Sequence, residues 1–265
     1  MGVLNVTPDS FSDGGRYARH DAALAHARQM LADGADIVDV GGESTRPGAA
    51  PVAEADEIDR VLPVIEALVA DGARVSVDTM KPAVMRAAIA AGAAMINDVR
   101  ALRAPGALEA AAASDVAVCL MHMQGEPRTM QAAPHYDDVV ADVRDFLATR
   151  AAAAIAAGIS HERIVLDPGF GFGKSLAHNL ALLRGLPELR ALGFPVLAGL
   201  SRKSSIGQIT GREASERTAG SLAAALAAVA RGAAIVRVHD VRETVDALKV
   251  WHAVNAPNGL SRESR

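Results

Sequence analysis

The chain alternates between short apolar runs and longer segments in which apolar residues recur every three or four positions. Short runs of Val, Ile and Leu are typical of buried parallel strands, and the longer period is typical of amphipathic helices. Strands are expected near residues 2–6, 36–40, 74–77, 94–97, 116–120, 163–166, 195–198 and 234–238. Helices are expected near residues 17–33, 52–70, 81–91, 105–113, 137–157, 176–190, 214–231 and 241–254.

Glycine marks the ends of many of the expected helices, where a left-handed residue lets the chain turn back towards the next strand. These glycines are Gly34, Gly72, Gly92, Gly158, Gly193 and Gly232. Eight strand–helix units in a chain of 265 residues, with no break in composition, favour an α/β fold of the (β/α)8 TIM-barrel type over an open doubly wound sheet. We expect a single domain over residues 1–255 and a flexible C-terminal tail over 256–265.

Composition narrows the choice of partners. The 27 basic and 31 acidic residues are interspersed, for a net charge of −4, so no basic stripe points to nucleic acid. No apolar run reaches the roughly 18 residues of a membrane span, and no secretory segment opens the chain, so a cytoplasmic protein is expected. The single cysteine, Cys119, is expected to be a buried hydrophobic residue.

Polar residues follow several expected strands, and in a barrel the carboxyl ends of all strands share the face that carries the active site. Asp78, Asn97 and Asp167 occupy three such positions. Carboxylates accept hydrogen bonds and donate none, so they select a ligand edge with adjacent N–H groups, such as a guanidine-like heterocycle. Asn97 offers both a donor and an acceptor, so it could bind a ligand edge that carries both kinds of group. The alternative is that these residues cap strands or pair with Lys and Arg structurally.

A second polar group consists of Asn5, Arg46, Arg237 and His239. Two guanidinium groups and an imidazole describe an anion site, because Arg makes forked hydrogen bonds to phosphate oxygens. The Asn5 amide oxygen could bind a Mg²⁺ ion that shares those phosphates. The competing interpretation pairs Arg237 with a neighbour such as Asp240.

Two further loops contain candidate chemistry. The segment 199–207 carries Lys203, which could reach the pocket or belong to a solvated basic loop. The glycine-rich segment 169–175 looks like a phosphate loop, but the required first glycine is replaced by Pro168. Its glycines are therefore expected to allow a tight turn after Asp167.

The histidines form neither a His-Glu-x-x-His motif nor a Cys/His cluster, so a zinc site is not expected. His122, just past the fifth strand, is a weaker site candidate. The histidines on the expected helices and loops are interpreted as solvated or locally hydrogen-bonded.

Eight short stretches, distributed in this order along nearly the whole chain, resemble the dihydropteroate synthase family of the folate pathway. They are Leu-Asn-Val-Thr-Pro-Asp-Ser-Phe-Ser-Asp-Gly-Gly at 4–15, Val-Gly-Gly-Glu-Ser-Thr-Arg-Pro-Gly at 40–48, Ser-Val-Asp-Thr at 76–79, Ile-Asn-Asp-Val at 96–99, Leu-Met-His-Met-Gln-Gly at 120–125, Leu-Asp-Pro-Gly-Phe-Gly-Phe-Gly-Lys at 166–174, Ser-Arg-Lys-Ser at 201–204 and Arg-Val-His-Asp-Val at 237–241.

The resemblance implies a homodimeric (β/α)8 barrel that joins p-aminobenzoate to a 7,8-dihydropterin methyl diphosphate and releases diphosphate with the help of Mg²⁺. It implies that the pterin is held by Asp78, Asn97, Asp167 and Lys203, with Met121 near its ring. The diphosphate and metal would be bound by Asn5, Arg46, Arg237 and His239, with Asn5 as the metal ligand. The p-aminobenzoate pocket would be formed by Thr45, Pro47, Phe172, Lys203 and Ser204. The catalytic residues would be Asp78, Lys203, Arg237 and His239.

The chemistry of these residues agrees with that reaction. If the C–O bond breaks first, positive charge spreads onto the pterin ring, where Asp78 would stabilise it. The Arg, His and Mg²⁺ side would stabilise the departing diphosphate. An aromatic amine is already a neutral nucleophile, so no strong general base is required.

Family members usually carry an N-terminal segment, often a hairpin, ahead of the first strand. This sequence begins inside that strand, so the hairpin is expected to be missing: either the start is truncated or the barrel floor is open, which concerns stability rather than the site. Two other functions remain open: a methyltetrahydrofolate methyltransferase on a related barrel, and a non-catalytic pterin-binding paralogue. A pure scaffold would not need polar groups at so many strand ends.

Overall fold

The computed structural model describes residues 1–6, 16–44, 50–125, 130 and 133–256. These residues form eight parallel strands that alternate with helices. The strands are β1 (Gly2–Asn5), β2 (Val38–Gly41), β3 (Val75–Asp78), β4 (Met95–Asp98), β5 (Ala117–Met121), β6 (Ile164–Asp167), β7 (Leu197–Ala198) and β8 (Ile235–Val236). The expected C-terminal tail lies outside the described residues, apart from Ala256.

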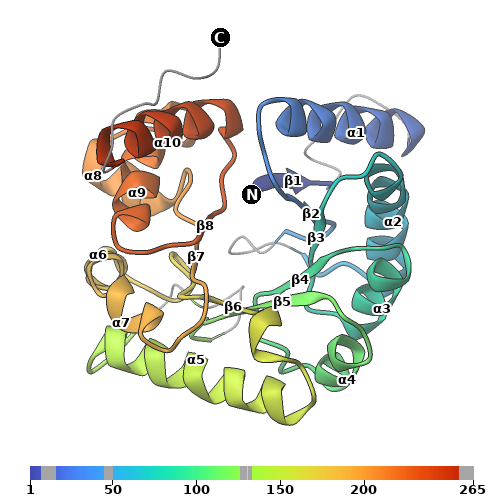
Figure 1. Cartoon of the computed structure of the whole chain (residues 1–265), viewed down its shortest axis with the longest axis horizontal. Coiled ribbons are helices and arrows are strands. Elements are labelled where there is room, and N and C mark those ends of the chain that lie inside the picture. Colours follow the sequence, from blue (N-terminus) through green and yellow to red (C-terminus); the bar gives the residue numbers. More distant parts are fainter. Residues whose placement is uncertain (7–15, 45–49, 126–129, 131–132, 257–265) are drawn as a thin grey trace.

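The strands close into a barrel. Strands β1 to β6 pair in chain order, and β7 pairs with β8. Two isolated parallel bridges, Leu166↔Val196 and Gly2↔Val238, join these two sheets at both edges. The backbone N–H of Val3 donates to the Val238 carbonyl at 3.0 Å across the last gap. The predicted (β/α)8 barrel is confirmed, and Figure 1 shows its strands inside a ring of helices.

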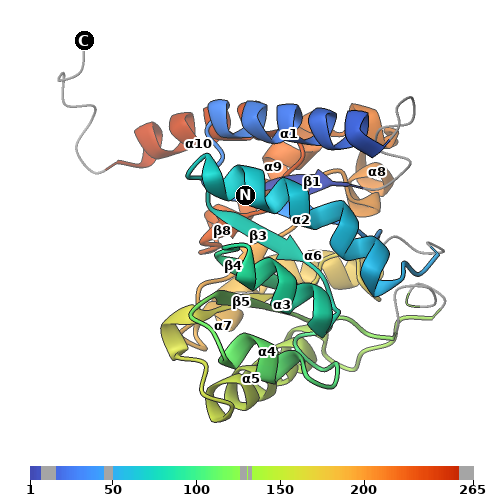
Figure 2. The same cartoon turned by 90° about the vertical axis from the view of Figure 1, so that its right-hand side faces the viewer.

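The helices cover the outside of the barrel, as the side view of α2 and α3 over β3 and β4 shows (Figure 2). They are α1 (Arg16–Ala32), α2 (Glu54–Ala70), α3 (Pro82–Ala90), α4 (Ala107–Ala112), α5 (Val139–Ala156), α6 (Leu176–Arg184), α7 (Leu186–Arg190), α8 (Ser204–Thr210), α9 (Thr218–Val229) and α10 (Val241–Asn255), with short 3-10 turns η2 (His161–Arg163) and η3 (Ala214–Glu216). Among the described residues, no helix is both long and apolar enough to cross a membrane.

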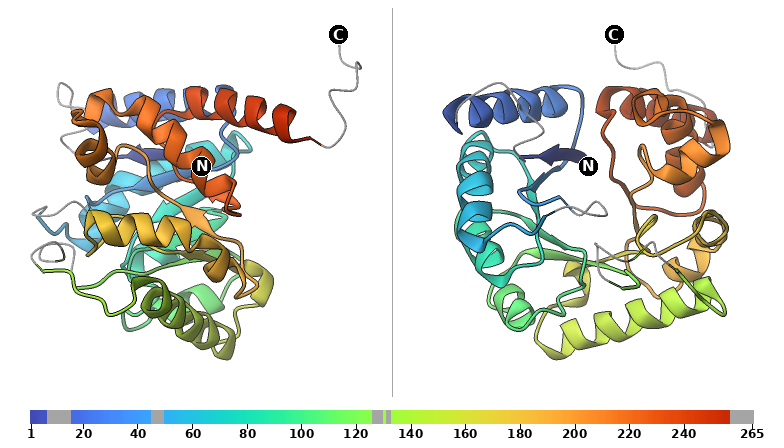
Figure 3. Two further views of the ribbon diagram at one scale, coloured as in Figure 1. Left: turned by 90° about the vertical axis from the view of Figure 1, so that its left-hand side faces the viewer. Right: turned by 180° about the vertical axis from the view of Figure 1, so that it is seen from behind.

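The glycines expected to end helices all adopt positive φ angles, between 80° and 99°. Gly34, which follows α1, also lies against α10, because a Cβ built on it would meet a Val245 methyl carbon at 3.2 Å. The first and last units of the barrel therefore meet at this point, and Figure 3 shows the blue helix α1 and the red helix α10 on the same side of the barrel.

The expectation of one helix over 176–190 is wrong, because Gly185 separates α6 from α7. Pro187 has no N–H group, so it suits the first turn of a new helix and not the interior of a long one. A Cβ on Gly185 would lie 2.7 Å from a Val140 methyl carbon, so α5 packs directly on the break. The expected helix over 214–231 likewise begins as η3 and becomes α-helical only at Thr218.

Alternation along the strands sorts side chains into two layers. One set of positions packs against the helices. The other set points into the barrel, where Met1, Met95, Cys119, Val165 and Leu197 form a separate apolar cluster. Cys119 is fully buried, as expected. Two residues farther along, the inward positions reach the mouth of the barrel, where Asn97 and Asp167 are polar and Val3, Met121 and Gly199 are not.

Candidate active site

A pocket opens where these inward positions end. It is lined by Val3, Asp78, Asn97, Val99, Met121, Asp167, Phe170, Phe172, Gly199, Ser201, Lys203, Arg237 and His239. Asp78, Asn97 and Asp167 follow inward positions of β3, β4 and β6 by the two-residue period. Residues spread over most of the sequence therefore meet around one small space, as the strand-end pattern predicts.

Other expected site residues are not part of this lining. Asn5 ends β1 and is half-buried, while Ser204 is exposed at the first position of α8. Thr45, Arg46 and Pro47 lie outside the described residues. Their expected roles stay predictions.

Arg237 joins two carboxylates at the centre of the site. Its Nε lies 2.6 Å from Asp39 Oδ2 and its Nη2 lies 2.7 Å from Asp78 Oδ2. Burial alone would lower the pKa of Arg237, but these carboxylates raise it overall, so the guanidinium stays charged. The suggested pairing with Asp240 is wrong, because that carboxylate accepts from Arg202 Nε at 3.1 Å.

Asp39 is a site residue that the sequence pattern did not single out. It is fully buried on β2 and accepts hydrogen bonds from Arg237 and, at 2.9 Å, from Asn97 Nδ2. Its other oxygen has no hydrogen-bond partner within the described part of the chain. The sequence did contain a signal for it, because an acidic residue within an apolar strand needs a buried partner for its charge.

The two predicted acids have different surroundings. Burial, together with nearby Asp39, raises the pKa of Asp78 to about 7 against the opposing effect of Arg237. Burial also raises the pKa of Asp167, opposed by the Gly169 N–H group, which donates to Oδ1 at 2.7 Å, and by Lys203. Asp78 can therefore change protonation state near neutral pH, which an exposed carboxylate does not do.

Lys203 places its ammonium against an aromatic face. Its Nζ lies 4.2 Å from the centre of the Phe172 ring. Burial and Arg237 lower the pKa of Lys203 to about 8, while Asp167 opposes this shift. A flat ligand in the pocket would thus meet an aromatic ring, a cation and an acid together.

His239 is held as a neutral donor. Its backbone N–H donates to Ser201 Oγ at 3.1 Å, and its Nδ1 lies 3.0 Å from the same oxygen. The Ser201 hydroxyl is then free to donate to Nδ1, which favours the tautomer with hydrogen on Nε2. Burial, Arg237 and Arg202 lower the pKa of His239 to about 4, so this imidazole is uncharged at neutral pH.

The glycine-rich segment forms the tight turn that was expected after Asp167. Gly169, Gly171 and Gly173 all have positive φ angles. A Cβ on Gly169 would lie 1.9 Å from the His122 carbonyl oxygen, so only glycine fits there. His122 itself does not line the pocket, because it lies behind this turn and contacts Lys174.

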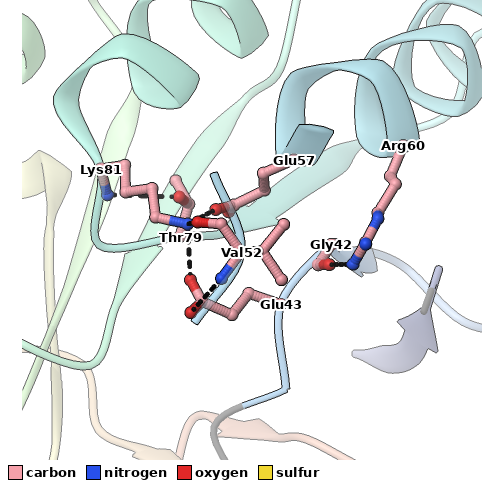
Figure 4. Close-up of polar contacts among 7 residues, drawn as sticks. All are labelled: Gly42, Glu43, Val52, Glu57, Arg60, Thr79 and Lys81. Atoms are coloured by element: carbon pink, nitrogen blue, oxygen red, sulfur yellow. Dashed lines mark hydrogen bonds and ion pairs between the residues drawn. The ribbon is translucent and has the colours of Figure 1, made fainter. Parts of the chain in front are cut away.

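A second polar cluster lies beside the pocket, between β2 and the starts of α2 and α3 (Figure 4). Lys81 Nζ contacts Glu43 Oε2 at 2.7 Å, Glu57 Oε2 at 2.6 Å and the Val52 carbonyl at 2.6 Å. The Val52 N–H donates to Glu43 Oε1 at 3.2 Å. Lys81 therefore ties together the described residues on both sides of 45–49.

Among the described residues, no group of three or more His, Cys, Asp or Glu side chains could hold a metal ion. The expected ligand Asn5 pairs in register with Gly41, which in turn pairs with Asp78 on β3. Its amide therefore lies at the same end of the barrel as the acids.

Comparison with known proteins agrees with the geometry. Residues 1–239 match the family described as pterin binding enzyme. Dihydropteroate synthase of Neisseria meningitidis serogroup B is 57% identical over 96% of this chain and 92% of its own length. A Xanthomonas albilineans dihydropteroate synthase structure with 4-aminobenzoic acid superposes with a TM-score of 0.92, at 60% identity, over 97% of this chain and 93% of that one. Another structure of that enzyme, in complex with 7,8-dihydropteroate, has a TM-score of 0.89 at 57% identity and covers 97% and 94% of the two chains. This chain belongs to the dihydropteroate synthase family of pterin-binding enzymes.

Proposed function

We propose that this protein is a dihydropteroate synthase: it condenses p-aminobenzoate with (7,8-dihydropterin-6-yl)methyl diphosphate to give 7,8-dihydropteroate and diphosphate. The observation that carries the proposal is the meeting of Asp78, Asn97 and Asp167 around one pocket that also holds Lys203 and Arg237. This arrangement suits a flat heterocycle with a donor-rich edge attached to an anionic group.

The hydrogen-bond donors on one edge of a pterin explain why the pocket contains acidic side chains. A 2-amino-4-oxo pterin presents adjacent N–H groups, which the Asp167 carboxylate would accept as a pair. Asn97, whose amide nitrogen is held by Asp39, would read the neighbouring mixed edge. Met121, which lines the pocket, would supply apolar surface for the pterin rings.

In the reaction, the bond between the pterin methylene and the diphosphate oxygen breaks, and the electron pair leaves with diphosphate. The ionised Asp78 carboxylate would stabilise the positive charge that spreads over the ring. The p-aminobenzoate nitrogen then attacks the methylene, and its surplus proton passes to diphosphate or water. Arg237 is already positioned by two carboxylates, and with the His239 Nε2–H group it would stabilise the leaving diphosphate.

Phe172 and Lys203 would hold the p-aminobenzoate ring and its carboxylate, since an ammonium over an aromatic face suits an aromatic acid. The family resemblance adds Thr45, Pro47 and Ser204 to this pocket and Arg46 to the diphosphate site. It also supports the proposal of a homodimer, and we propose a cytoplasmic location from the sequence pattern.

We also propose Mg²⁺ as the metal. The residues fit this ion, which commonly binds through one or two protein oxygens, water and substrate phosphates and needs no dedicated cluster. Asn5 would supply one amide oxygen at the phosphate end. When bound, Mg²⁺ would offset negative charge on the departing diphosphate.

The test is turnover by the purified protein with dihydropterin methyl diphosphate, p-aminobenzoate and Mg²⁺. We expect 7,8-dihydropteroate and diphosphate in equal amounts. Methyl transfer from a methyltetrahydrofolate instead would identify the related methyltransferase. Tight pterin binding without product would identify a non-catalytic paralogue.

A further inference from the structure

Lys174 is a buried lysine behind the pocket that the proposed reaction does not use. Its exposed fraction is 3%. Its Nζ lies 2.9 Å from the Gly169 carbonyl, 3.0 Å from the Phe172 carbonyl and 2.9 Å from His122 Nδ1. None of these three partners is a carboxylate.

Burying an ammonium without a carboxylate partner is destabilising, so its hydrogen bonds must offset the loss of water. An ammonium has three protons, and these three acceptors, with the His122 carbonyl as a fourth and longer contact at 3.3 Å, satisfy them. His122 must be neutral to accept through Nδ1, which agrees with burial and Lys174 lowering its pKa to about 3. Lys174 therefore binds both ends of the turn from Gly169 to Phe172.

This turn shapes the pterin side of the pocket. The Gly169 N–H donates to Asp167 Oδ1 at 2.7 Å, and the Phe172 N–H donates to the Gly169 carbonyl at 3.1 Å. Phe172 and Asp167 both line the pocket. The ammonium of Lys174 thus acts on two lining residues through backbone that it contacts directly.

We propose that Lys174 is a positioning residue for the pterin: its ammonium fixes the Gly169–Phe172 turn, and its positive charge keeps Asp167 in the carboxylate form. The inference rests on the proposed function, because it assumes that Asp167 accepts the pterin edge. Lys174 itself does not touch substrate.

The titratable groups that face Lys174 come from three parts of the barrel. Asp167 ends β6, Lys203 precedes α8, and His122 follows β5. The positive charge of Arg103 helps to lower the pKa of His122. Burial lowers the pKa of Lys174 to about 7, opposed by Asp167 and assisted by Lys203. Nearby, the Tyr136 hydroxyl donates to the Gly173 carbonyl, so it adds a fixed dipole and no charge.

These charges determine how pterin affinity depends on pH. Asp167 must be ionised to accept the pterin, so affinity is lost as pH falls through its pKa. Without the Lys174 charge that pKa is higher, and the loss begins at a higher pH. Above about pH 8 Lys174 is mostly neutral even in the native protein, so the variants and the native protein should converge there.

The experiment measures affinity for dihydropterin methyl diphosphate by calorimetry, without p-aminobenzoate, from about pH 5.5 to 9. Lys174→Met removes the charge and the donors, whereas Lys174→Gln removes the charge but keeps two N–H donors. Lys249→Met is the matched control, because Lys249 on α10 is 74% exposed. Thermal unfolding is recorded for each protein.

We expect both Lys174 variants to bind the pterin more weakly at pH values below the Asp167 pKa, by about tenfold for each one-unit rise in that pKa. The gap should narrow at high pH, more completely for Lys174→Gln than for Lys174→Met. The control should match the native protein throughout.

Native affinity and an unshifted pH profile in both variants would overturn the proposal, as would an equal loss at every pH. Failure of both variants to fold would assign Lys174 to barrel folding instead and also overturn it. The proposed function is tested separately, by turnover of the native protein. If the native protein binds the pterin but does not turn over, the proposed function is contradicted and this inference is not. If the native protein turns over and the Lys174 variants bind the pterin normally, this inference is contradicted and the proposed function is not.

Discussion

At the scale of single residues, the site depends on charges that hold one another in place. Arg237 on β8 is bonded to Asp39 on β2 and Asp78 on β3, so its guanidinium is oriented before any ligand binds. Such preorganised charge is more effective in catalysis than charge that must reorient during the reaction. Asp39 accepts hydrogen bonds from both Arg237 and Asn97, so it is a structural partner of two residues that line the pocket.

Asp167 gives the simplest residue-scale prediction. Replacing Asp167 with Ala should weaken pterin binding by about 1.5–3 kcal/mol, the usual contribution of a hydrogen bond to a charged group. Calorimetric titration with the pterin substrate measures this loss. Unaltered affinity would remove Asp167 from the pterin site.

Asp78 predicts a pH dependence. Because burial raises the pKa of Asp78 to about 7, the carboxylate is ionised only as pH rises through that value. If the ionised form stabilises the cation, kcat/KM for the pterin substrate should rise with an inflection near pH 7, below the pH range in which Lys203 loses its charge. Asp78→Asn should lack this inflection and be slower by about 10²–10³-fold, the scale for losing one such electrostatic group. A variant with the native pH profile would show that another group titrates.

At the scale of elements, Lys81 connects the start of α3 to β2 and α2. Glu57 is only 1% exposed and depends on Lys81 for its charge partner. Removing one member of a buried pair leaves the other charge uncompensated, at a typical cost of 3–5 kcal/mol. Because Lys81 is itself partly exposed, the lower end of that range applies.

Lys81→Met should therefore lower the free energy of unfolding by about 3 kcal/mol, measured by urea denaturation. Lys249→Met is again the control, with an expected change below about 1 kcal/mol because its pair with Asp246 is exposed. Equal stability of the two variants would mean that Glu57 finds another partner.

The elements that the sequence predicted are those fixed by local patterns. Strand and helix periodicity and the glycines that end helices are properties of a few neighbouring residues, so the alternation was recognisable. The break at Gly185 was not, because it depends on the contact with Val140 in α5. Asp39 was missed for a related reason: its partners Asn97 and Arg237 are 58 and 198 positions away.

For the whole molecule, the barrel explains why scattered residues form one site. The inward positions change from apolar to polar at the same level on several strands, so an apolar core lies directly beneath a charged pocket. That floor keeps water from the lower side, which strengthens the interactions among Arg237, Asp39 and Asp78.

The proposed p-aminobenzoate pocket predicts inhibition by sulfonamides, which copy the shape of that substrate. Inhibition should be competitive with p-aminobenzoate, so raising its concentration should restore the native rate. Steady-state kinetics at several drug concentrations provide the measurement. Turnover unchanged at saturating drug would contradict the assignment of this pocket.

The most direct test of the central claim is a crystal structure with the pterin diphosphate and p-aminobenzoate bound. The account predicts the pterin edge on the Asp167 carboxylate, its ring beside Asp78 and Asn97, and the diphosphate facing Arg237 and His239. A pterin bound elsewhere, with Asp78, Asn97 and Asp167 contacting no common ligand, would contradict it.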